Sequence, residues 1–588
     1  RRSGPTLRCR VVYCRLLRVD ILGRGWTGIR AFVLYAAVAF CFFGLRLLID
    51  HGSNYIGAGA DPQIFIWSFG WWPHAILHGQ NPFATTAIWA PDGVNLAWTT
   101  TVPGLALLFS PLTLIAGPVI SYNVAAVLMP ALAAWTAFLL CRHLTRRVWS
   151  SLVGGYLFGF SSYMLGQELG HLHATSVFLV PLFALVVLRY VDGALDARGL
   201  VVRFGPLLAL QLLFSTELVF TVTLALACSL AVGIVVAPSS RRRLVTLIAP
   251  VAVGYVLAAI LTAPFVYYLL TGFQKSAIHP PQDFLTDLLN FVIPTRLALS
   301  GHGWANPISS RFPGNDSERG AYLGVPALLI VALFAYKRLR TPGGRFLVAS
   351  FLLAALAALG SELTIDGRTV LPLPWGRGVV PLPWEHVAYL PLFDNVLVER
   401  LSLFVALATA VMVSLWTAAV RKGVLQWLPP ALAILAIAPN PAAAGWVTSF
   451  SVPAFFTESA YRTCLSPGEN ILPLPVSFGG DANLWQVESG FKFTMAGGYV
   501  ASGPPSQFVT SDVVGRVAYG NPVPAEEAET LITYIRDKHV TSVIVDKSER
   551  RLWSGALNRI AAPRDIGGVL LYKVASPVRR CPHASINR

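Results

Sequence analysis

Apolar runs of about 20 residues recur along this chain, and they constrain its fold more than any other feature of the sequence. A run of this length crosses a bilayer as a helix, because a helix satisfies its own backbone hydrogen bonds within the hydrocarbon core. Only 13% of the 588 residues are charged, whereas about 25% is typical of soluble domains. The sequence therefore predicts a multi-pass α-helical membrane protein and excludes a soluble enzyme, a disordered chain and a fibrous protein.

The apolar runs predict about 11 transmembrane helices within residues 31–449, with outer loops at 51–120, 268–320 and 361–400. We expect these helices at 31–48, 122–141, 148–165, 175–190, 206–214, 218–237, 244–264, 321–335, 346–360, 401–420 and 425–446. The apolar segment 103–118 is short and contains Pro and Gly, so we expect it to be re-entrant or interfacial.

The distribution of basic residues predicts the orientation in the plasma membrane. Residues 1–30 contain eight Arg and a single acid, Asp20, whereas residues 51–141 contain no Lys or Arg. Basic segments remain in the cytoplasm, so we expect a cytoplasmic N-terminus, a retained first helix and an outer loop after it. This topology also accounts for the net charge of +16, and no nucleic acid is expected as a partner.

After Ser451 the apolar runs shorten and alternate with polar residues. The pattern predicts a helix at 529–536 and strands at 541–546 and 568–574. We therefore expect a small extracytoplasmic α/β domain over residues 450–588. It contains Cys464 and Cys581, which either pair in an oxidising compartment or stay as free thiols.

Asp61, in the first outer loop, is the strongest candidate for a catalytic role. A carboxylate at the start of an aromatic segment beside a membrane is costly unless it is solvated, paired or functional. It can act as a general base on a substrate hydroxyl, or it can simply cap a helix that starts at Pro62. Trp67 and Trp71 either line a sugar pocket or belong to an interfacial aromatic belt.

Ionisable residues at two further outer turns are candidates for binding an acceptor or a sugar. Glu168, His171 and His173 can bind a hydroxyl, relay a proton or form an ordinary polar turn. Glu217 lies between two apolar stretches, where it is either functional or adjacent to a helix cap. These two His supply at most two metal ligands, so we assign no metal site; a divalent cation remains possible as a cofactor, and no other is expected.

Cations are rare in the outer segments, so those present are candidates for binding a donor phosphate. Arg400 and Arg319 rank first because each directly precedes an expected helix, and Lys275 and Arg296 rank lower. Each of the first two can instead pair with its neighbouring Glu or anchor at the interface. The Pro-rich loop 371–391, with its Trp residues, either shapes a lipid entry groove or is a rigid connector.

Several of these features together resemble the C-type glycosyltransferase superfamily, and more closely an uncharacterised actinobacterial branch of it. They are an acid soon after the first helix, a long outer loop, a short re-entrant segment, and then Tyr122-Asn123 and Cys141-Arg142-His143. The resemblance covers residues 31–446. It implies an enzyme with a polyprenyl-phosphate-linked sugar as donor and a glycan or lipid as acceptor outside the cytoplasm, with Asp61 as catalytic base. Many relatives carry a pair of acids in this loop, whereas Gln63 stands near Asp61 here.

Two other functions stay open on the sequence: a transporter or flippase of a lipid-linked saccharide, and a non-enzymatic scaffold of the cell envelope. A transporter is expected to show inverted repeats and charges at mid-membrane, and the sequence shows no such repeat. The substitution Asp61→Asn separates the three, because only an enzyme loses sugar transfer while keeping its fold.

Overall fold

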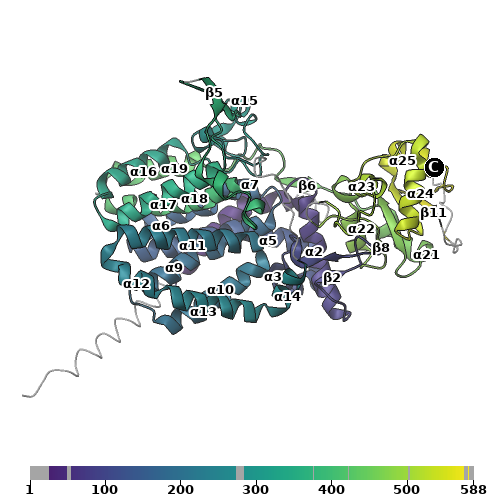
Figure 1. Cartoon of the computed structure of the whole chain (residues 1–588), viewed down its shortest axis with the longest axis horizontal. Helices are drawn as coiled ribbons and strands as arrows, with labels where there is room; N and C mark the ends of the chain where they lie inside the picture. Colours follow the sequence, from purple (N-terminus) through teal and green to yellow (C-terminus); the bar gives the residue numbers. More distant parts are fainter. Residues whose placement is uncertain are drawn as a thin grey trace, which may run out of the picture.

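The computed structural model describes residues 26–48, 54–272, 284–374, 376–420, 423–500, 503–574 and 581. Long helices form one body, and the segment after β6 (Val447–Ser449) folds as a distinct α/β unit at one end of it (Figure 1). We call residues 454–574 together with Cys581 the C-terminal unit.

Within the described residues, eight helices are long and apolar enough to cross a membrane. They are Trp26–Leu48, α5 (Pro118–Thr145), Leu172–Val191, α10 (Ala197–Phe214), α11 (Thr216–Val236), Pro238–Leu261, α17 (Pro342–Leu359) and Val398–Ala419. Helices at the three other expected positions are shorter: α6 (Val148–Gly159), α16 (Val325–Arg338) and α19 (Val424–Ala436). A helix is therefore present at each of the 11 expected positions. Only eight of these helices, among the described residues, are long enough to cross a membrane.

Local capping sets the helix ends and explains one difference from expectation. The Asp196 carboxylate accepts a hydrogen bond from the backbone N–H of Gly199 at 2.7 Å, so α10 starts at Ala197 rather than at 206. Ser215 caps α11 by accepting from the N–H of Leu218 at 3.3 Å. A single residue, Ser215, therefore separates two long antiparallel helices.

The apolar segment 103–118 does not form a span. It is divided into α3 (Pro103–Leu108) and α4 (Ser110–Ala116), which are each shorter than two full turns. Leu108 and Ile115 are exposed, as expected for an interfacial or re-entrant element in contact with lipid.

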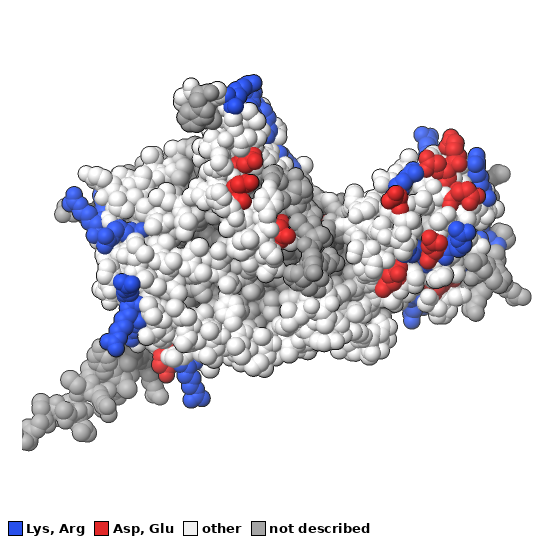
Figure 2. Space-filling view, viewed as in Figure 1, with Lys and Arg blue, Asp and Glu red and all other residues white. Residues whose placement is uncertain are grey.

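The helical body presents an almost uncharged face in Figure 2. Lys and Arg gather at the end remote from the C-terminal unit, where Figure 1 places α12 (Arg241–Thr246) with its three Arg. At the other end lie α2 (Asp61–Leu77) and the C-terminal unit, and α7 (Ser162–Gln167) lies nearer the middle of the helical body. The candidate site described below lies at this second end.

The C-terminal unit is built on a mixed five-stranded sheet with the order β10-β11-β9-β7-β8. β7 pairs in parallel with β8 and β9, and β9, β11 and β10 pair antiparallel. The strands are β7 (Asn470–Leu474), β8 (Thr494–Met495), β9 (Ser542–Asp546), β10 (Arg564–Ile566) and β11 (Val569–Lys573). The helices are α20 (Ala454–Thr457), α21 (Tyr461–Cys464), α22 (Ala482–Glu488), α23 (Asp512–Ala518), α24 (Ala528–Asp537) and α25 (Arg550–Leu557). The helix and both strands predicted from the sequence correspond to α24, β9 and β11.

Pairing between distant segments fixes the C-terminal unit to the helical body. β1 (Asn54–Ile56) pairs antiparallel with β6. Outer-loop residues 87–90 run beside β8: the N–H of Met495 donates to the carbonyl of Ala87 at 2.9 Å, and that of Trp89 donates to Gly497 at 3.0 Å. Residues 87–90 therefore extend the sheet of the C-terminal unit, so that the two parts share backbone hydrogen bonds.

Cys464 and Cys581 form a disulfide across a sequence separation of 117 residues. Such a long closed loop restricts the unfolded chain strongly, so we expect Cys464→Ser with Cys581→Ser to lower the free energy of unfolding of the C-terminal unit by about 2–5 kcal/mol. Hydrogen exchange of β9 and β11 peptides under oxidising conditions measures this loss. Unchanged exchange in the double variant would contradict the pairing, and Cys228→Ser, which removes a free thiol of α11, serves as the control.

Candidate functional site

Asp61 is the first residue of α2, and its carboxylate faces away from the helix end. The expected capping role is not observed: Ala60 is the N-cap, and no side chain caps the helix. Oδ2 of Asp61 lies 2.9 Å from Nε2 of His171 instead, and Oδ1 accepts a hydrogen bond from the hydroxyl of Tyr499 at 2.7 Å. The carboxylate is thus held by two side chains that come from distant parts of the chain.

Two glycines allow the segments that carry Asp61 and His171 to touch. Gly57 has a φ of +100°, and a Cβ there would lie 2.8 Å from the carbonyl oxygen of Leu169. Gly170 has a φ of +146°, and its Cβ would lie 3.0 Å from Cδ of Pro62. A side chain at either position would push the two backbones apart and separate His171 from Asp61.

The surroundings of Asp61 keep it ionised. Burial by itself would raise the pKa of Asp61, but the hydrogen bond and charge of His171 and the hydroxyl of Tyr499 outweigh burial and lower the pKa to about 2. The same contact, added to burial, raises the pKa of Tyr499 above its ordinary value. Asp61 is therefore a carboxylate throughout the physiological range.

Both ring nitrogens of His171 lie next to side-chain oxygens. The amide nitrogen of Gln167 donates to the carbonyl of Ser317 at 2.8 Å and to Glu318 at 3.2 Å, so its amide oxygen faces Nδ1 of His171, at 2.9 Å. Nε2 of His171 faces the ionised Asp61 at 2.9 Å. The ring therefore links Asp61 to Gln167.

Arg400 lies buried between two carboxylates. Its Nε donates to Glu318 at 2.9 Å, its Nη2 pairs with the other Glu318 oxygen, and its Nη1 donates to Glu217 at 2.6 Å. Burial would raise the pKa of Glu318, but the charge of Arg400 lowers it below the ordinary value. The pairs expected from the sequence, Arg400 with Glu399 and Arg319 with Glu318, are not those observed.

These contacts form one network. Tyr499, Asp61 and His171 connect through Gln167 and Glu318 to Arg400, which reaches Glu217. The structure therefore brings together the predicted base and the first-ranked predicted cation. Tyr499, Gln167 and Glu318 were not among the predicted site residues; an acid in an outer loop was a visible signal for Glu318, and nothing near Tyr499 in the sequence indicated its role.

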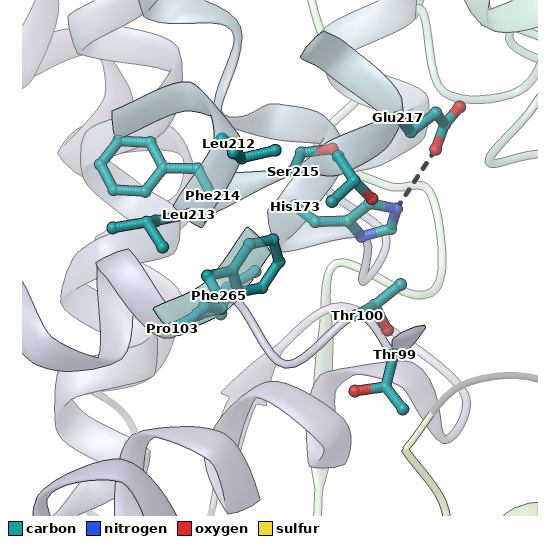
Figure 3. Close-up of a pocket in the computed structure, with 12 residues that line it drawn as sticks. Thr99, Thr100, Pro103, His173, Leu212, Leu213, Phe214, Ser215, Glu217 and Phe265 are labelled. Atoms are coloured by element: carbon teal, nitrogen blue, oxygen red, sulfur yellow. Dashed lines mark ion pairs between the residues drawn. The ribbon is translucent and has the colours of Figure 1, made fainter. Parts of the chain in front are cut away.

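His173 lies on the Arg400 side of the network, next to a small cavity. Its Nε2 is 3.6 Å from a Glu217 oxygen, and both residues line a cavity of about 60 Å³ together with Thr99 and Phe265 (Figure 3). Figure 3 shows the His173 ring between the Glu217 carboxylate and the segment that carries Thr99 and Thr100. The cavity is therefore lined by both polar and apolar side chains, and it lies beside the contact between Arg400 and the partly exposed Glu217.

Glu168, predicted to bind an acceptor, is buried instead. It is 2% exposed, and Oε1 has no hydrogen-bond partner among the described residues. Burial raises the pKa of Glu168 well above its ordinary value. The prediction that it meets a sugar from solvent is incorrect, because its side chain has no open surface.

Trp67 and Trp71, offered as walls of a sugar pocket, belong to the interface between α2 and the C-terminal unit. They are 0% and 3% exposed and stack on each other with ring centroids 5.4 Å apart. Nε1 of Trp67 donates to Gln486 of α22 at 2.7 Å, and both rings contact Phe491. The pocket-wall interpretation is incorrect because these rings are covered by protein.

The other predicted cations that the structure describes, Arg319 and Arg296, already have protein oxygens as partners. The Arg319 guanidinium donates to the carbonyls of Phe312 at 2.6 Å and Gly314 at 2.8 Å, so it clamps the loop that carries Glu318. Arg296 donates to Asp316 at 2.6 Å and to the carbonyl of Ala444 at 2.7 Å. We assign neither to a phosphate, and Lys275 lies outside the described residues.

The residues of the network do not suit a divalent cation. The described part of the chain holds no group of three or more His, Cys, Asp or Glu side chains arranged as metal ligands. The space between Glu217 and Glu318, where two carboxylates converge, is filled by the Arg400 guanidinium. We therefore derive no chemical step through a metal.

Removal of its partners is expected to raise the pKa of Asp61. His171→Ala with Tyr499→Phe removes the interactions that lower this pKa from its ordinary value to about 2, while burial, which raises it, remains. Carbodiimides modify only protonated carboxyls, so Asp61 should be modified at pH 4–5 in the double variant and stay unmodified in the unsubstituted protein. Peptide mass spectrometry detects the adduct. Equal modification in both proteins would show that these contacts do not hold Asp61 ionised.

Comparisons with known proteins concern both the family and the fold. A family model described as "Domain of unknown function (DUF6311)" matches residues 32–388. No curated protein matches the sequence. Among solved structures, the arabinofuranosyltransferase AftD from Mycobacteria is similar with 14% identity and a TM-score of 0.56, over 94% of this chain and 40% of AftD. This chain therefore spans well under half the length of AftD.

Two further structures are similar at a lower level. The oligosaccharyltransferase AglB from Archaeoglobus fulgidus, in complex with an inhibitory peptide and a dolichol-phosphate, has 11% identity and a TM-score of 0.45, over 94% of this chain and 75% of AglB. ArnT from Cupriavidus metallidurans, bound to undecaprenyl phosphate, has 12% identity and a TM-score of 0.38, over 93% of this chain and 99% of ArnT.

Proposed function

The chain belongs to the DUF6311 family and has the fold of the C-type glycosyltransferase superfamily, and from this premise we propose that it is a membrane glycosyltransferase. It transfers a sugar from a polyprenyl-phosphate donor to a glycan or lipid acceptor outside the cytoplasm. The proposal includes the predicted sidedness, with the N-terminus in the cytoplasm and the C-terminal unit outside.

One observation carries the proposal: a large apolar cavity is lined by the residue that follows a buried cation, and side-chain contacts connect this cation to an ionised carboxylate. A cavity of about 450 Å³ lies between α9 (Val180–Val191), α11, α17 and α18 (Ser402–Ala419), and its lining is almost entirely apolar. Leu401, the residue after Arg400, lines it together with Trp384, and Arg400 itself is not part of the lining. An isoprenoid chain fits such a lining, and its phosphate fits a guanidinium. Trp384 belongs to the Pro-rich loop that the sequence offered as a lipid groove.

The Arg400 side chain supplies the charge that a leaving phosphate requires. A sugar phosphodiester carries one negative charge, and the polyprenyl phosphate that leaves carries two. Negative charge therefore increases on the phosphate oxygens while the bond between the sugar and the phosphate breaks. The partly exposed Glu217 carboxylate holds the Nη1 side of Arg400 in the free protein. We infer that the donor phosphate takes this position and that Glu217 turns toward His173, 3.6 Å away.

Asp61 orients the attacking hydroxyl of the acceptor. A bond forms between this oxygen and the anomeric carbon while the bond from that carbon to the phosphate oxygen breaks. The hydroxyl proton passes to Asp61 late in the reaction, because a carboxylate of such low pKa accepts it only when the new bond has made the hydroxyl strongly acidic. A single displacement with one base inverts the anomeric centre.

Blocking the apolar cavity tests whether it holds the lipid. Ala357 of α17 lines the cavity, so Ala357→Trp should weaken binding of decaprenyl phosphate by at least about tenfold, because the indole fills the volume that the chain needs. Native mass spectrometry of the full chain in nanodiscs measures the affinity. Leu352→Trp, at an exposed position on the same helix, is the matched control and should bind normally. Equal affinities for both variants would remove the cavity from the proposal.

A further inference from the structure

The C-terminal unit places an exposed aromatic ring next to the residues that hold Asp61. Phe478 is 60% exposed, and its ring lies 6.1 Å from that of Tyr499 in an edge-to-face arrangement. Tyr499 in turn donates to Asp61. Exposed large apolar side chains are rare among the described residues of this unit: Phe478, Tyr519 and Leu552.

Polar groups that suit sugar hydroxyls lie beside this ring. Asp481, three residues after Phe478, accepts a hydrogen bond from Nε2 of Gln63. Gln63 is the one hydrogen-bond partner of the Asp481 carboxylate among the described residues, which leaves its second oxygen for a ligand. A carboxylate beside an aromatic face can bind sugar hydroxyls by hydrogen bonds while the ring covers the C–H face of the sugar.

The backbone fixes these groups relative to Asp61. The Asn483 side chain forms hydrogen bonds with the backbone of Tyr499. Its Nδ2 donates to the Tyr499 carbonyl at 2.6 Å, and its Oδ1 accepts from the Tyr499 N–H at 3.2 Å. Asn483 and Asp481 both belong to the start of α22, which packs along α2 through the contact of Gln486 with Trp67. These contacts therefore hold Asp481 and Tyr499 next to the segment of α2 that carries Asp61.

We propose that the acceptor is a saccharide that binds in the seam between α2 and the C-terminal unit, stacked on Phe478 and hydrogen-bonded to Asp481, whose carboxylate the buried Gln63 holds in place. Its reacting hydroxyl reaches Asp61 beside Tyr499. The inference depends on the proposed function and adds to it the chemical class and the position of the acceptor. It also gives the C-terminal unit a direct role in the reaction site.

Substitutions at Phe478 separate sugar stacking from simple hydrophobicity. Phe478→Trp keeps an aromatic face, whereas Phe478→Leu keeps only apolar surface. The full chain in nanodiscs is titrated with linear arabinofuranosyl and mannosyl trisaccharides as probes, and saturation-transfer NMR reports binding. We expect Phe478→Leu and Asp481→Ala to weaken binding of at least one probe by fivefold or more, with Phe478→Trp close to the unsubstituted protein. Leu552→Ala, an exposed apolar residue of α25 in the same unit, is the matched control and should have no effect.

The outcomes distinguish failure of this inference from failure of the proposed function. Binding of decaprenyl phosphate is measured on the same samples and should be equal in all Phe478 variants. If no probe binds in a way that depends on Phe478, or if Phe478→Leu equals the unsubstituted protein, the acceptor subsite is refuted even when the lipid phosphate binds. If decaprenyl phosphate also fails to bind the unsubstituted protein, the proposed function itself is refuted.

Discussion

Asp61→Asn is expected to lower the rate of sugar transfer by about a thousandfold, the range typical for the loss of a general base. The amide cannot accept the acceptor proton, and it carries no negative charge. Its oxygen can still accept a hydrogen bond from Tyr499, and its NH2 group can donate to Nε2 of His171 when that nitrogen carries no proton, so the geometry of the site is kept. Transfer of radiolabelled sugar from a polyprenyl-phosphate donor to a saccharide acceptor measures the rate.

Two companion measurements identify what Asp61→Asn has removed. Decaprenyl phosphate should bind the variant as it binds the unsubstituted protein, because the lipid site is at Arg400. Asp394→Asn, which alters a carboxylate that accepts a hydrogen bond from Asn395 and is outside the network of Asp61, is the control and should keep full activity. A variant with normal transfer would refute the catalytic role of Asp61, and loss of saccharide flux without any transfer product would favour a transporter.

Arg400→Met is expected to have the largest effect on both stability and lipid binding. The substitution leaves Glu318 and Glu217 as carboxylates without their cation, and Glu318 is 4% exposed. Removal of one partner from a buried ion pair costs about 3–5 kcal/mol in the free energy of unfolding. Urea denaturation in detergent measures this loss, and native mass spectrometry measures the loss of decaprenyl phosphate.

A compensating variant separates the structural role of Arg400 from its role toward phosphate. Arg400→Met combined with Glu217→Gln and Glu318→Gln removes the unpaired charges, so stability should largely return while lipid binding stays absent. Arg400→Lys keeps the charge but not the fork that binds two carboxylates, and should be intermediate in both measurements. Normal lipid binding in the triple variant would show that the phosphate does not bind at Arg400.

The candidate site could be predicted in part because its members mark the outer ends of apolar segments. Asp61, His171, Glu217 and Arg400 are each ionisable residues next to a hydrophobic run, where a charge is costly unless it is paired or functional. The structure joins all four in one network. The sequence could not say which carboxylate each cation would choose, and the neighbouring pair that it suggested for Arg400, with Glu399, is not formed.

The incorrect predictions concern surfaces that folding covers. Trp67 and Trp71 look like a sugar-binding face along an aromatic segment, but α22 of the C-terminal unit packs on them. Glu168 is only three residues before His171 in the same turn. Its side chain nevertheless points into the core, whereas that of His171 contacts Asp61. Whether a side chain meets solvent depends on elements far away in the sequence, and local pattern holds no information on them.

The sequence by itself determined that much of this chain lies in lipid, and this environment determined the class of fold. Long apolar segments in lipid must be helices, because no other open structure satisfies the backbone there, and the basic clusters between them indicate an orientation. Only the tertiary structure decided which groups meet in the candidate site. Tyr499 reaches Asp61 across 438 residues, and Arg400 reaches Glu318 across 82. Such contacts arise from helix packing and from the sheet that joins the first outer loop to the C-terminal unit, and these arrangements depend on shape complementarity of the whole chain rather than on any local pattern.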